Sequence, residues 1–383
     1  MNVFLRSNKI LHDNITWLLT SDIRINDGKN KGALYGWKNL NPPSFPFIYS
    51  EITGYAITYY SWITFEFGNP DALSAANDSY DWIAKNIRSH LVIAKPPGTQ
   101  NQPNQLSDIY YSFDNGMIII GLLNLHKITQ NANILQFAEK MTQALIERFF
   151  DGETLIPRLD KSFNPMMGEN DDDGIVKWST ISGAYHSKLS IGLLEISRLT
   201  NNPTYSQVSN SICDYALKLQ GSRGQFITNP GSDIVYLHPH LYACEGLIYS
   251  GLKQSNENQY EAGLEGLKWA VDQLVVNKAH ALFRNTKKGS VEQSDCTAQL
   301  LRLLVLCRNS LTNFFSDSNL NDIIDRLHSR LLEFYIPAGE GQGAMKYQLG
   351  LDTACSWCTM FSTQALNLWK NKNSAPTWID YFV

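Results

Sequence analysis

The feature that most constrains the fold of this chain is a helical segment, nearly free of charge, that recurs six times with small, aromatic or ionisable residues at its opening. The openings lie about 50 to 70 residues apart, which fits one helical hairpin plus its loops. Segments with uncharged middles are typical of helices buried on most sides. The six segments read SEITGYAITYYSWI from Ser50, SFDNGMIIIGLLNLH from Ser112, SGAYHSKLSIGLLEI from Ser182, HPHLYACEGLIYSGL from His238, EQSDCTAQLLRLLVL from Glu292 and ACSWCTMFSTQALNLW from Ala354.

More polar segments alternate with these six, and their charged and apolar residues recur at helical spacing. They predict outer helices at about 7–19, 70–88, 132–149, 203–220, 256–276 and 320–334. Six inner and six outer helices in alternation predict an all-α (α/α)6 barrel, which is a closed double ring of helices. Because the chain has no linker, low-complexity tract or break in composition, we expect residues 1–383 to form a single toroid domain.

Charge and composition exclude several classes of partner. A net charge of -4 and the absence of Lys/Arg runs longer than two speak against nucleic acid. No stretch of about 18 uncharged apolar residues indicates a membrane span, and the first residues lack a secretory signal pattern. The six cysteines are scattered, so we expect reduced thiols and a cytoplasmic protein. The oligomeric state stays open.

Three segments resemble the six-hairpin glycosidase-like superfamily, which includes unsaturated glucuronyl hydrolases and N-acylglucosamine 2-epimerases. The resemblance extends over about residues 50–369 and implies a toroid whose inner helices direct their N-termini at a funnel. It also implies an enzyme that acts on a small sugar or an oligosaccharide, for which we expect no cofactor. The segments are FDNGMIIIGLLNLHKIT from Phe113, WSTISGAYHSKLSIGLLEISRLTNNPTY from Trp178 and HPHLYACEGLIYSGL from His238.

Asp114 is the leading catalytic candidate. It stands in Phe113-Asp114-Asn115-Gly116, a stretch that resembles the His-Asp-x-Gly-Phe motif of the unsaturated glucuronyl hydrolases. In that motif the Asp belongs to the acid/base pair, so the resemblance implies the same role for Asp114, although Phe113 replaces the motif's His and Met117 its Phe. The alternative is an ordinary aspartate at a helix start that satisfies free N–H groups.

A second carboxylate is harder to assign. The third inner segment, where those hydrolases carry another Asp, offers Tyr185 and His186 instead. Sugar hydrolysis usually requires two carboxylates that flank one bond. Candidates for the second are Glu51, Glu245, Asp295 and the acidic loop 169–173. Glu51 and Asp295 also fit a helix's first turn without any function, because acidic groups are favourable there.

The fourth inner segment suggests a different reaction. His238 and His240 precede Glu245 in a stretch that resembles the fourth inner helix of the 2-epimerases. The resemblance implies a sugar epimerase or isomerase that uses one of these histidines with Glu245, since histidine suits proton transfer near neutral pH. Alternatively, the two histidines are structural and bond to loop carbonyls.

Aromatic residues at the helix openings are candidate sugar platforms, because sugar C–H faces stack on rings; alternatively they fill the core. The substrate-binding candidates are Tyr111, Trp178, Tyr185, His186, His238, Tyr242 and Trp357.

We expect no metal. Four cysteines stand at the openings of the last three inner segments, but the Trp-Cys-x-Gly and Cys-His-Gly signatures of the zinc-binding lanthionine cyclases are absent.

The sequence leaves three functional hypotheses. They are a hydrolase for an acidic, uronic-acid-type oligosaccharide with Asp114 as general acid/base, a sugar epimerase, and a toroid that binds glycan or protein without chemistry.

Overall fold

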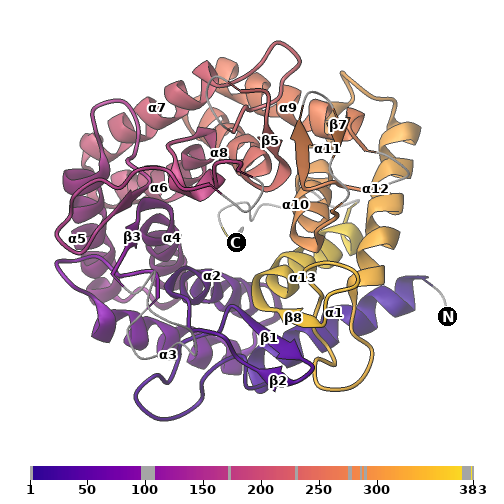
Figure 1. Cartoon of the computed structure of the whole chain (residues 1–383), viewed down its shortest axis with the longest axis horizontal. Coiled ribbons are helices and arrows are strands. Elements are labelled where there is room, and N and C mark those ends of the chain that lie inside the picture. Colours follow the sequence, from indigo (N-terminus) through magenta and orange to yellow (C-terminus); the bar gives the residue numbers. More distant parts are fainter. Residues whose placement is uncertain are drawn as a thin grey trace.

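The helices form two concentric rings, as Figure 1 shows. The computed structural model describes residues 3–95, 108–170, 174–228, 232–274, 278–284, 287–288, 291–372 and 381. The inner ring consists of α2 (Ser50–Phe67), α4 (Ser112–Thr129), α6 (Ser190–Thr200), α8 (Leu237–Gln254), α10 (Ser294–Leu306) and α13 (Ser356–Lys370). The outer ring consists of α1 (Val3–Thr20), α3 (Pro70–Asn86), α5 (Ala132–Phe149), α7 (Pro203–Lys218), α9 (Glu257–Asp272) and α12 (Asp317–Leu331). The predicted (α/α)6 barrel is therefore confirmed.

Short elements connect these helices. A brief helix α11 (Arg308–Leu311) follows α10, and 3-10 turns stand at η1 (Trp178–Thr180), η2 (Ala184–Leu189) and η3 (Leu332–Phe334). Among the described residues, no helix is long and apolar enough to cross a membrane.

Small antiparallel sheets surround the end of the barrel where the inner helices begin. Strands β3 (Tyr110–Tyr111), β5 (Val235–Tyr236) and β8 (Thr353–Cys355) run directly into α4, α8 and α13. Their partners are β4 (Arg158–Leu159), β6 (Leu282–Arg284) with β7 (Lys287–Lys288), and β1 (Trp37–Leu40) with β2 (Pro43–Ser44). The helical periodicity of the chain does not predict these strands.

Inner and outer helices begin in different ways. Four outer helices are capped by an asparagine side chain, at Asn69, Asn131, Asn202 and Asn256. The inner helices α2, α4, α8, α10 and α13 have no side-chain cap. Ser50 instead donates its hydroxyl to the carbonyl of Ile93 at 2.7 Å. The inner helix starts are thus fixed to neighbouring loops, and their first-turn N–H groups face the end of the barrel where a ligand would enter.

Glycines allow the inner helices to pack closely. A Cβ at Gly54 on α2 would lie 2.9 Å from the Cα of Ile118 on α4. A Cβ at Gly246 on α8 would lie 2.1 Å from the carbonyl carbon of Ser187 in η2. Real Cβ atoms are not found this close to backbone, so both contacts require glycine.

The third inner segment differs from its prediction. The helical pattern predicts a regular helix from Ser182, but α6 begins only at Ser190 and η2 precedes it. The hydroxyl of Ser187 bonds to the carbonyls of Ala184 and Ala243, so this stretch is shaped by its contact with α8. Tyr185 and His186 therefore lie on a tight, fully buried 3-10 turn.

Candidate functional site

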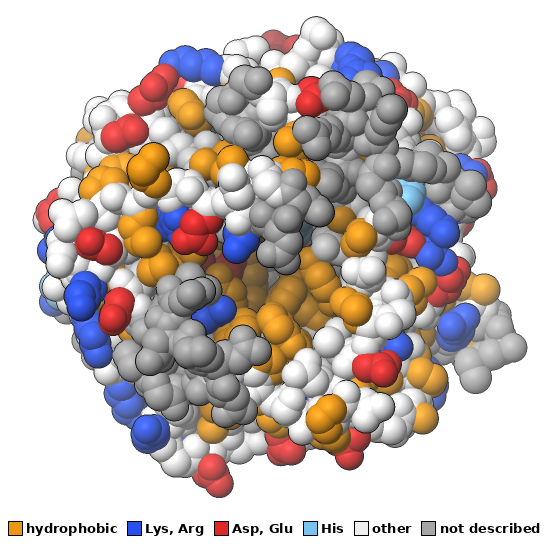
Figure 2. All heavy atoms as spheres, in the orientation of Figure 1, with side chains coloured by type: hydrophobic (Ala, Val, Ile, Leu, Met, Phe, Trp, Pro, Cys, Tyr) orange, Lys and Arg blue, Asp and Glu red, His pale blue; other side chains and the backbone are white. Residues whose placement is uncertain are grey.

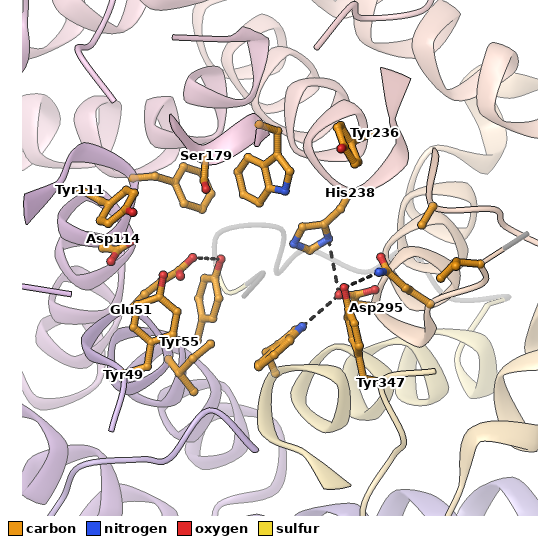
Figure 3. Close-up of a pocket in the computed structure, with 17 residues that line it drawn as sticks. Tyr49, Glu51, Tyr55, Tyr111, Asp114, Ser179, Tyr236, His238, Asp295 and Tyr347 are labelled. Atoms are coloured by element: carbon orange, nitrogen blue, oxygen red, sulfur yellow. Dashed lines mark hydrogen bonds and ion pairs between the residues drawn. The ribbon is translucent and has the colours of Figure 1, made fainter. Parts of the chain in front are cut away.

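A cavity of about 400 Å³ opens where the inner helices begin. Figure 2 shows it as a hollow in the middle of one face, surrounded by hydrophobic and aromatic side chains. In Figure 3, Glu51 and Asp114 lie on one wall of the cavity. His238 and Asp295 lie on the opposite wall. The lining residues are Tyr49, Glu51, Ile52, Tyr55, Tyr111, Phe113, Asp114, Trp178, Ser179, Tyr236, His238, Ala281, Val291, Gln293, Asp295, Tyr347 and Trp357.

Glu51 stands in the first turn of α2 and is partly buried. Its Oε1 accepts a hydrogen bond of 2.8 Å from the hydroxyl of Tyr55, one turn further along the helix. Burial raises the pKa of Glu51 to about 7, and its hydrogen bonds from Tyr55 and Tyr49 oppose that rise. A carboxyl with this pKa exchanges its proton near neutral pH, which is the property of a catalytic acid or base.

Asp114 stands in the first turn of α4, on the same wall as Glu51. Burial raises the pKa of Asp114 well above its usual range, and the nearby charge of Glu51 raises it further. Oδ2 of Asp114 has no hydrogen-bond partner among the described residues. Two carboxyl groups that repel each other in a poorly hydrated site retain at least one proton between them, because both cannot ionise at low cost.

Asp295 lies on the opposite wall, in the first turn of α10. Its Oδ1 accepts a hydrogen bond of 2.7 Å from the backbone N–H of Cys296. Its Oδ2 accepts a hydrogen bond of 3.0 Å from the indole N–H of Trp357 on α13. The carboxyl is thereby oriented by two N–H donors from two inner helices.

His238, near the start of α8, lies beside Asp295. Its Nδ1 lies 2.6 Å from Oε1 of Gln299 and 4.0 Å from Oδ2 of Asp295. An amide oxygen only accepts hydrogen bonds, so Nδ1 carries the proton and Nε2 retains the lone pair. Burial lowers the pKa of His238, which keeps the ring neutral at pH 7. The imidazole can therefore accept a proton.

One group of side chains in this wall has the composition of a metal site. The potential ligand atoms of His238, Asp295 and Cys296 all lie within 4.8 Å of one another. All three side chains are already engaged: His238 with Gln299, Asp295 with Trp357, and the Cys296 thiol with Gln293 at 3.7 Å. Burial also raises the pKa of the Cys296 thiol, whereas zinc binds the thiolate. These residues form a hydrogen-bonded cluster, which fits a metal poorly.

Of the predicted aromatic platforms, Tyr111, Trp178 and Trp357 line the cavity. Tyr185 packs against one of them, with its ring centroid 5.1 Å from that of Trp178. Tyr242 is fully buried below the cavity, with its hydroxyl 2.6 Å from that of Tyr55. The residues that line the cavity can contact a ligand, whereas Tyr185 supports its wall and Tyr242 its floor.

Three predicted site residues lie away from the cavity. His240 is buried between α8 and α9, where Nδ1 accepts from the Phe226 N–H at 3.1 Å and Nε2 donates to the Gly266 carbonyl at 3.0 Å. This is the structural arrangement that the sequence left as an alternative. His186 is buried against Ser112, at 3.1 Å. Glu245 is fully buried and paired with Lys188 at 2.5 Å.

The acidic loop 169–173 contributes no carboxyl to the described lining. Glu169 lies in an ion pair with Arg158 at 2.6 Å. Asp171, Asp172 and Asp173 lie outside the described residues.

Comparison with known proteins supports the assignment of the fold. No protein-family model and no curated protein matches the chain. Among solved structures, it is similar to a sugar epimerase from a ruminal bacterium, with a TM-score of 0.76 and 12% identity over 95% of this chain and 98% of the other. A cellobiose 2-epimerase from Bacillus thermoamylovorans gives a TM-score of 0.74 and 13% identity, over 96% and 100%. An unsaturated glucuronyl hydrolase specific for heparin gives 0.68 and 10%, over 96% and 97%.

This chain has the six-hairpin (α/α)6 toroid fold. At these identities the likeness concerns the fold alone.

Several lining residues of this toroid were not predicted from the sequence. Tyr55 stands four positions after Glu51 on α2, a spacing that places both on one helix face and would have identified it. Tyr49 and Tyr236 each directly precede an inner helix. Tyr347 comes from the loop before α13, and its hydroxyl bonds to Gln293. No local signal points to Tyr347, because its loop reaches the cavity only through the ring closure.

Proposed function

We propose that this protein is a carbohydrate-active enzyme, and specifically a glycoside hydrolase for an acidic, uronic-acid-type oligosaccharide. The observation that carries the proposal is the pair of carboxyls with raised pKa, Glu51 and Asp114, on one wall of an aromatic cavity with a third carboxyl, Asp295, opposite. A volume of about 400 Å³ falls within the range of small-molecule sites.

Asp114 is the general acid. Because burial raises its pKa well above the usual range, the protonated form is favoured, and that proton can be donated to the glycosidic oxygen. Glu51, beside it, stabilises the positive charge that develops on the sugar ring as the bond breaks. Asp295, oriented by Trp357, accepts the proton of the water that attacks the anomeric carbon.

The preference for an acidic sugar is supported by cations near the acidic wall. The ammonium of Lys95 lies 3.7 Å from the ring centroid of Phe47 and is half-buried. Its charge interacts with those of Asp114 and Lys177. A sugar carboxylate would be attracted to this side of the cavity mouth, because positive charges at a cleft concentrate anionic ligands.

A sugar epimerase is the second candidate, supported by the neutral imidazole of His238 beside Asp295. The reaction would use His238 as the base that removes a proton from carbon. Neither His240 nor Glu245 lines the cavity, so neither would take part directly.

One experiment separates these functions. The protein is incubated in D2O with a panel of neutral and uronic-acid oligosaccharides, and the products are followed by proton NMR. Hydrolysis releases new reducing ends without deuterium on carbon, whereas epimerisation through a solvent-exchanging base inserts deuterium at the inverted carbon. We expect new reducing ends from uronic-acid substrates. Deuterium at carbon would replace the hydrolase with the epimerase, and binding without either product would indicate a toroid that only binds glycan.

The variant Asp114→Asn tests the assignment of the acid. Its matched control is Asp317→Asn, which changes another first-turn aspartate on the outer helix α12. We expect only Asp114→Asn to abolish product release.

A further inference from the structure

A chain of hydroxyl groups leads from the cavity into the barrel. The Tyr55 hydroxyl donates to Oε1 of Glu51 at 2.8 Å, and its oxygen lies 2.6 Å from the hydroxyl of Tyr242. Tyr55 has one proton, which it gives to Glu51, so Tyr242 must be the donor in the second bond. The direction of donation is therefore from Tyr242 to Tyr55 to Glu51.

This chain joins helices that are distant in the ring. Tyr55 stands on α2 and Tyr242 on α8, and Figure 1 shows these two helices on opposite sides of the ring. Tyr55 is 2% exposed and Tyr242 is 0% exposed, so the bond between them is shielded from water. Hydrogen bonds in a shielded chain polarise one another and hold their members in one geometry.

A buried group of charges lies below Tyr242. Lys188 in η2 is paired with Glu245 at 2.5 Å, and its ammonium lies 5.6 Å from the ring centroid of Tyr242. The guanidinium of Arg302 on α10 stacks on Phe361 and interacts electrostatically with Glu245 and both tyrosines. All three charged residues are fully buried. The ring of Tyr242 is thus held against fully buried charged side chains.

We propose that Tyr242 is a positioning residue, which through Tyr55 fixes the carboxyl group of Glu51 and stabilises its ionised form. The proposal rests on the proposed function in that it takes Glu51 as a working group of the site.

Other groups also act on Glu51 and must stay unchanged in a test. They are Tyr49 before α2, Asp114 on α4 and Tyr185 in η2, each of which interacts with Glu51. Replacement of Tyr242 by phenylalanine removes one hydroxyl and keeps the ring, so these neighbours stay in place.

The test is a direct titration of Glu51 in the absence of substrate. Protein labelled with carbon-13 at the glutamate carboxyl is titrated by NMR, and the Glu51 signal is assigned as the one missing in Glu51→Gln. Loss of a donor to the charged form disfavours that form, so we expect Tyr242→Phe to raise the pKa of Glu51 by about 0.5 to 1 unit. Tyr55→Phe, which removes the direct donor, should raise it at least as much.

The matched control is Tyr59→Phe, because Tyr59 lies one turn beyond Tyr55 on α2 and is equally buried. It should leave the Glu51 titration unchanged. The proposal is wrong if folded Tyr242→Phe titrates like the wild type, or if Tyr59→Phe shifts the pKa as much. Should Tyr242→Phe fail to fold, Tyr242→Met, which also lacks the hydroxyl and fills the space with a flexible apolar chain, takes its place in the titration.

If the proposed function is wrong, the Glu51 titration and the hydrolysis assay give a different combination of results. A shifted pKa together with no hydrolysis of any substrate would leave Tyr242 as the residue that positions Glu51 and overturn only the reaction. Hydrolysis together with an unshifted pKa would overturn only the role of Tyr242. In a working hydrolase, the pH profile of kcat/KM should move in Tyr242→Phe by the same amount as the Glu51 titration.

Discussion

The indole N–H of Trp357 donates a hydrogen bond of 3.0 Å to Oδ2 of Asp295, a residue 62 positions earlier in the chain. The two side chains come from α13 and α10, which are adjacent in the inner ring. Trp357 thus both presents an aromatic face to the cavity and orients a carboxyl group.

Replacement of Trp357 by phenylalanine separates these two contributions. The variant keeps an aromatic ring and removes the N–H donor, and hydrogen bonds to charged groups contribute about 1.5–3 kcal/mol. We expect turnover to fall about tenfold or more. Trp37→Phe is the control, because its indole N–H bonds to Asn39 instead. Equal losses in both variants would show that the bond to Asp295 is irrelevant.

Asp114→Asn should remove catalysis without harming the fold. The wild-type carboxyl is buried and its pKa is raised well above the usual range, which favours the neutral form, so a neutral amide is a close substitute. We expect a change in unfolding free energy of about 1 kcal/mol or less and a fall in turnover of about 100-fold or more. Denaturant melts and steady-state rates measure the two effects. Near-full activity in the folded variant would reduce Asp114 to a residue of the helix start.

The stability of the protein should depend on the charge state of Glu51. Its pKa is about 7 in the folded protein, above the value of 4.5 for a free glutamate. A raised pKa means that the folded state holds the proton more tightly, so stability is fully present below about pH 4.5 and falls as pH rises through 7. The Glu51→Gln side chain cannot ionise, so this variant should not lose stability in that way as pH rises.

Melting temperatures from pH 5 to pH 9 measure this difference. The curves of wild type and Glu51→Gln should diverge as pH rises, with the variant relatively more stable at pH 9. Parallel curves would mean that Glu51 titrates alike in the folded and unfolded chains.

Substitution of His238 and of His240 should have different effects, because only His238 lines the cavity. His240 bonds to Phe226 and Gly266 inside the core, so His240→Ala leaves these groups unpaired and should cost about 2 kcal/mol or more of stability. His238→Ala should also cost some stability, because it leaves the buried Gln299 amide oxygen without its partner, but its main effect should be on the cavity wall. A hydrolase driven by carboxyls should lose less than about tenfold in rate with His238→Ala, whereas an epimerase should lose about 100-fold.

Purified protein should carry no stoichiometric zinc. The thiol, imidazole and carboxyl of Cys296, His238 and Asp295 are close enough to share an ion but are occupied by hydrogen bonds. Elemental analysis should find far less than one zinc per chain, and a chelator should leave the melting temperature unchanged. Cys296→Ser is the control, since loss of bound zinc in that variant alone would demonstrate a metal site.

The ring itself could be predicted from local pattern. Burial of an inner helix on most sides keeps most charge out of its middle, as in residues 118–123 of α4, although α8 and α10 keep Glu245 and Arg302 there. The first-turn acids Glu51, Asp114 and Asp295 could be found in the same way, and all three line the cavity. The orderly alternation of the helices then follows from their need to cover one another's apolar faces.

Side-chain direction within a single helix also follows from the sequence. His238 and His240 are two positions apart, and an α-helix turns by about 200° over two residues, so only one can face the cavity. Glu245 returns to the face of His238 after two turns, about 10 Å deeper along the axis. That depth explains why Glu245 pairs with Lys188 below the floor.

What the sequence determined by itself is the toroid and the set of groups at its mouth. The tertiary structure alone decided which of them meet: Glu51 with Asp114, Asp295 with Trp357, and Tyr55 with Tyr242. The physical reason is that helix periodicity is a local property of the chain, whereas these contacts depend on how six hairpins close into a ring and which helix starts face each other across it. The raised pKa values of the acidic pair follow from that closure, since burial and mutual repulsion exist only once the ring is complete.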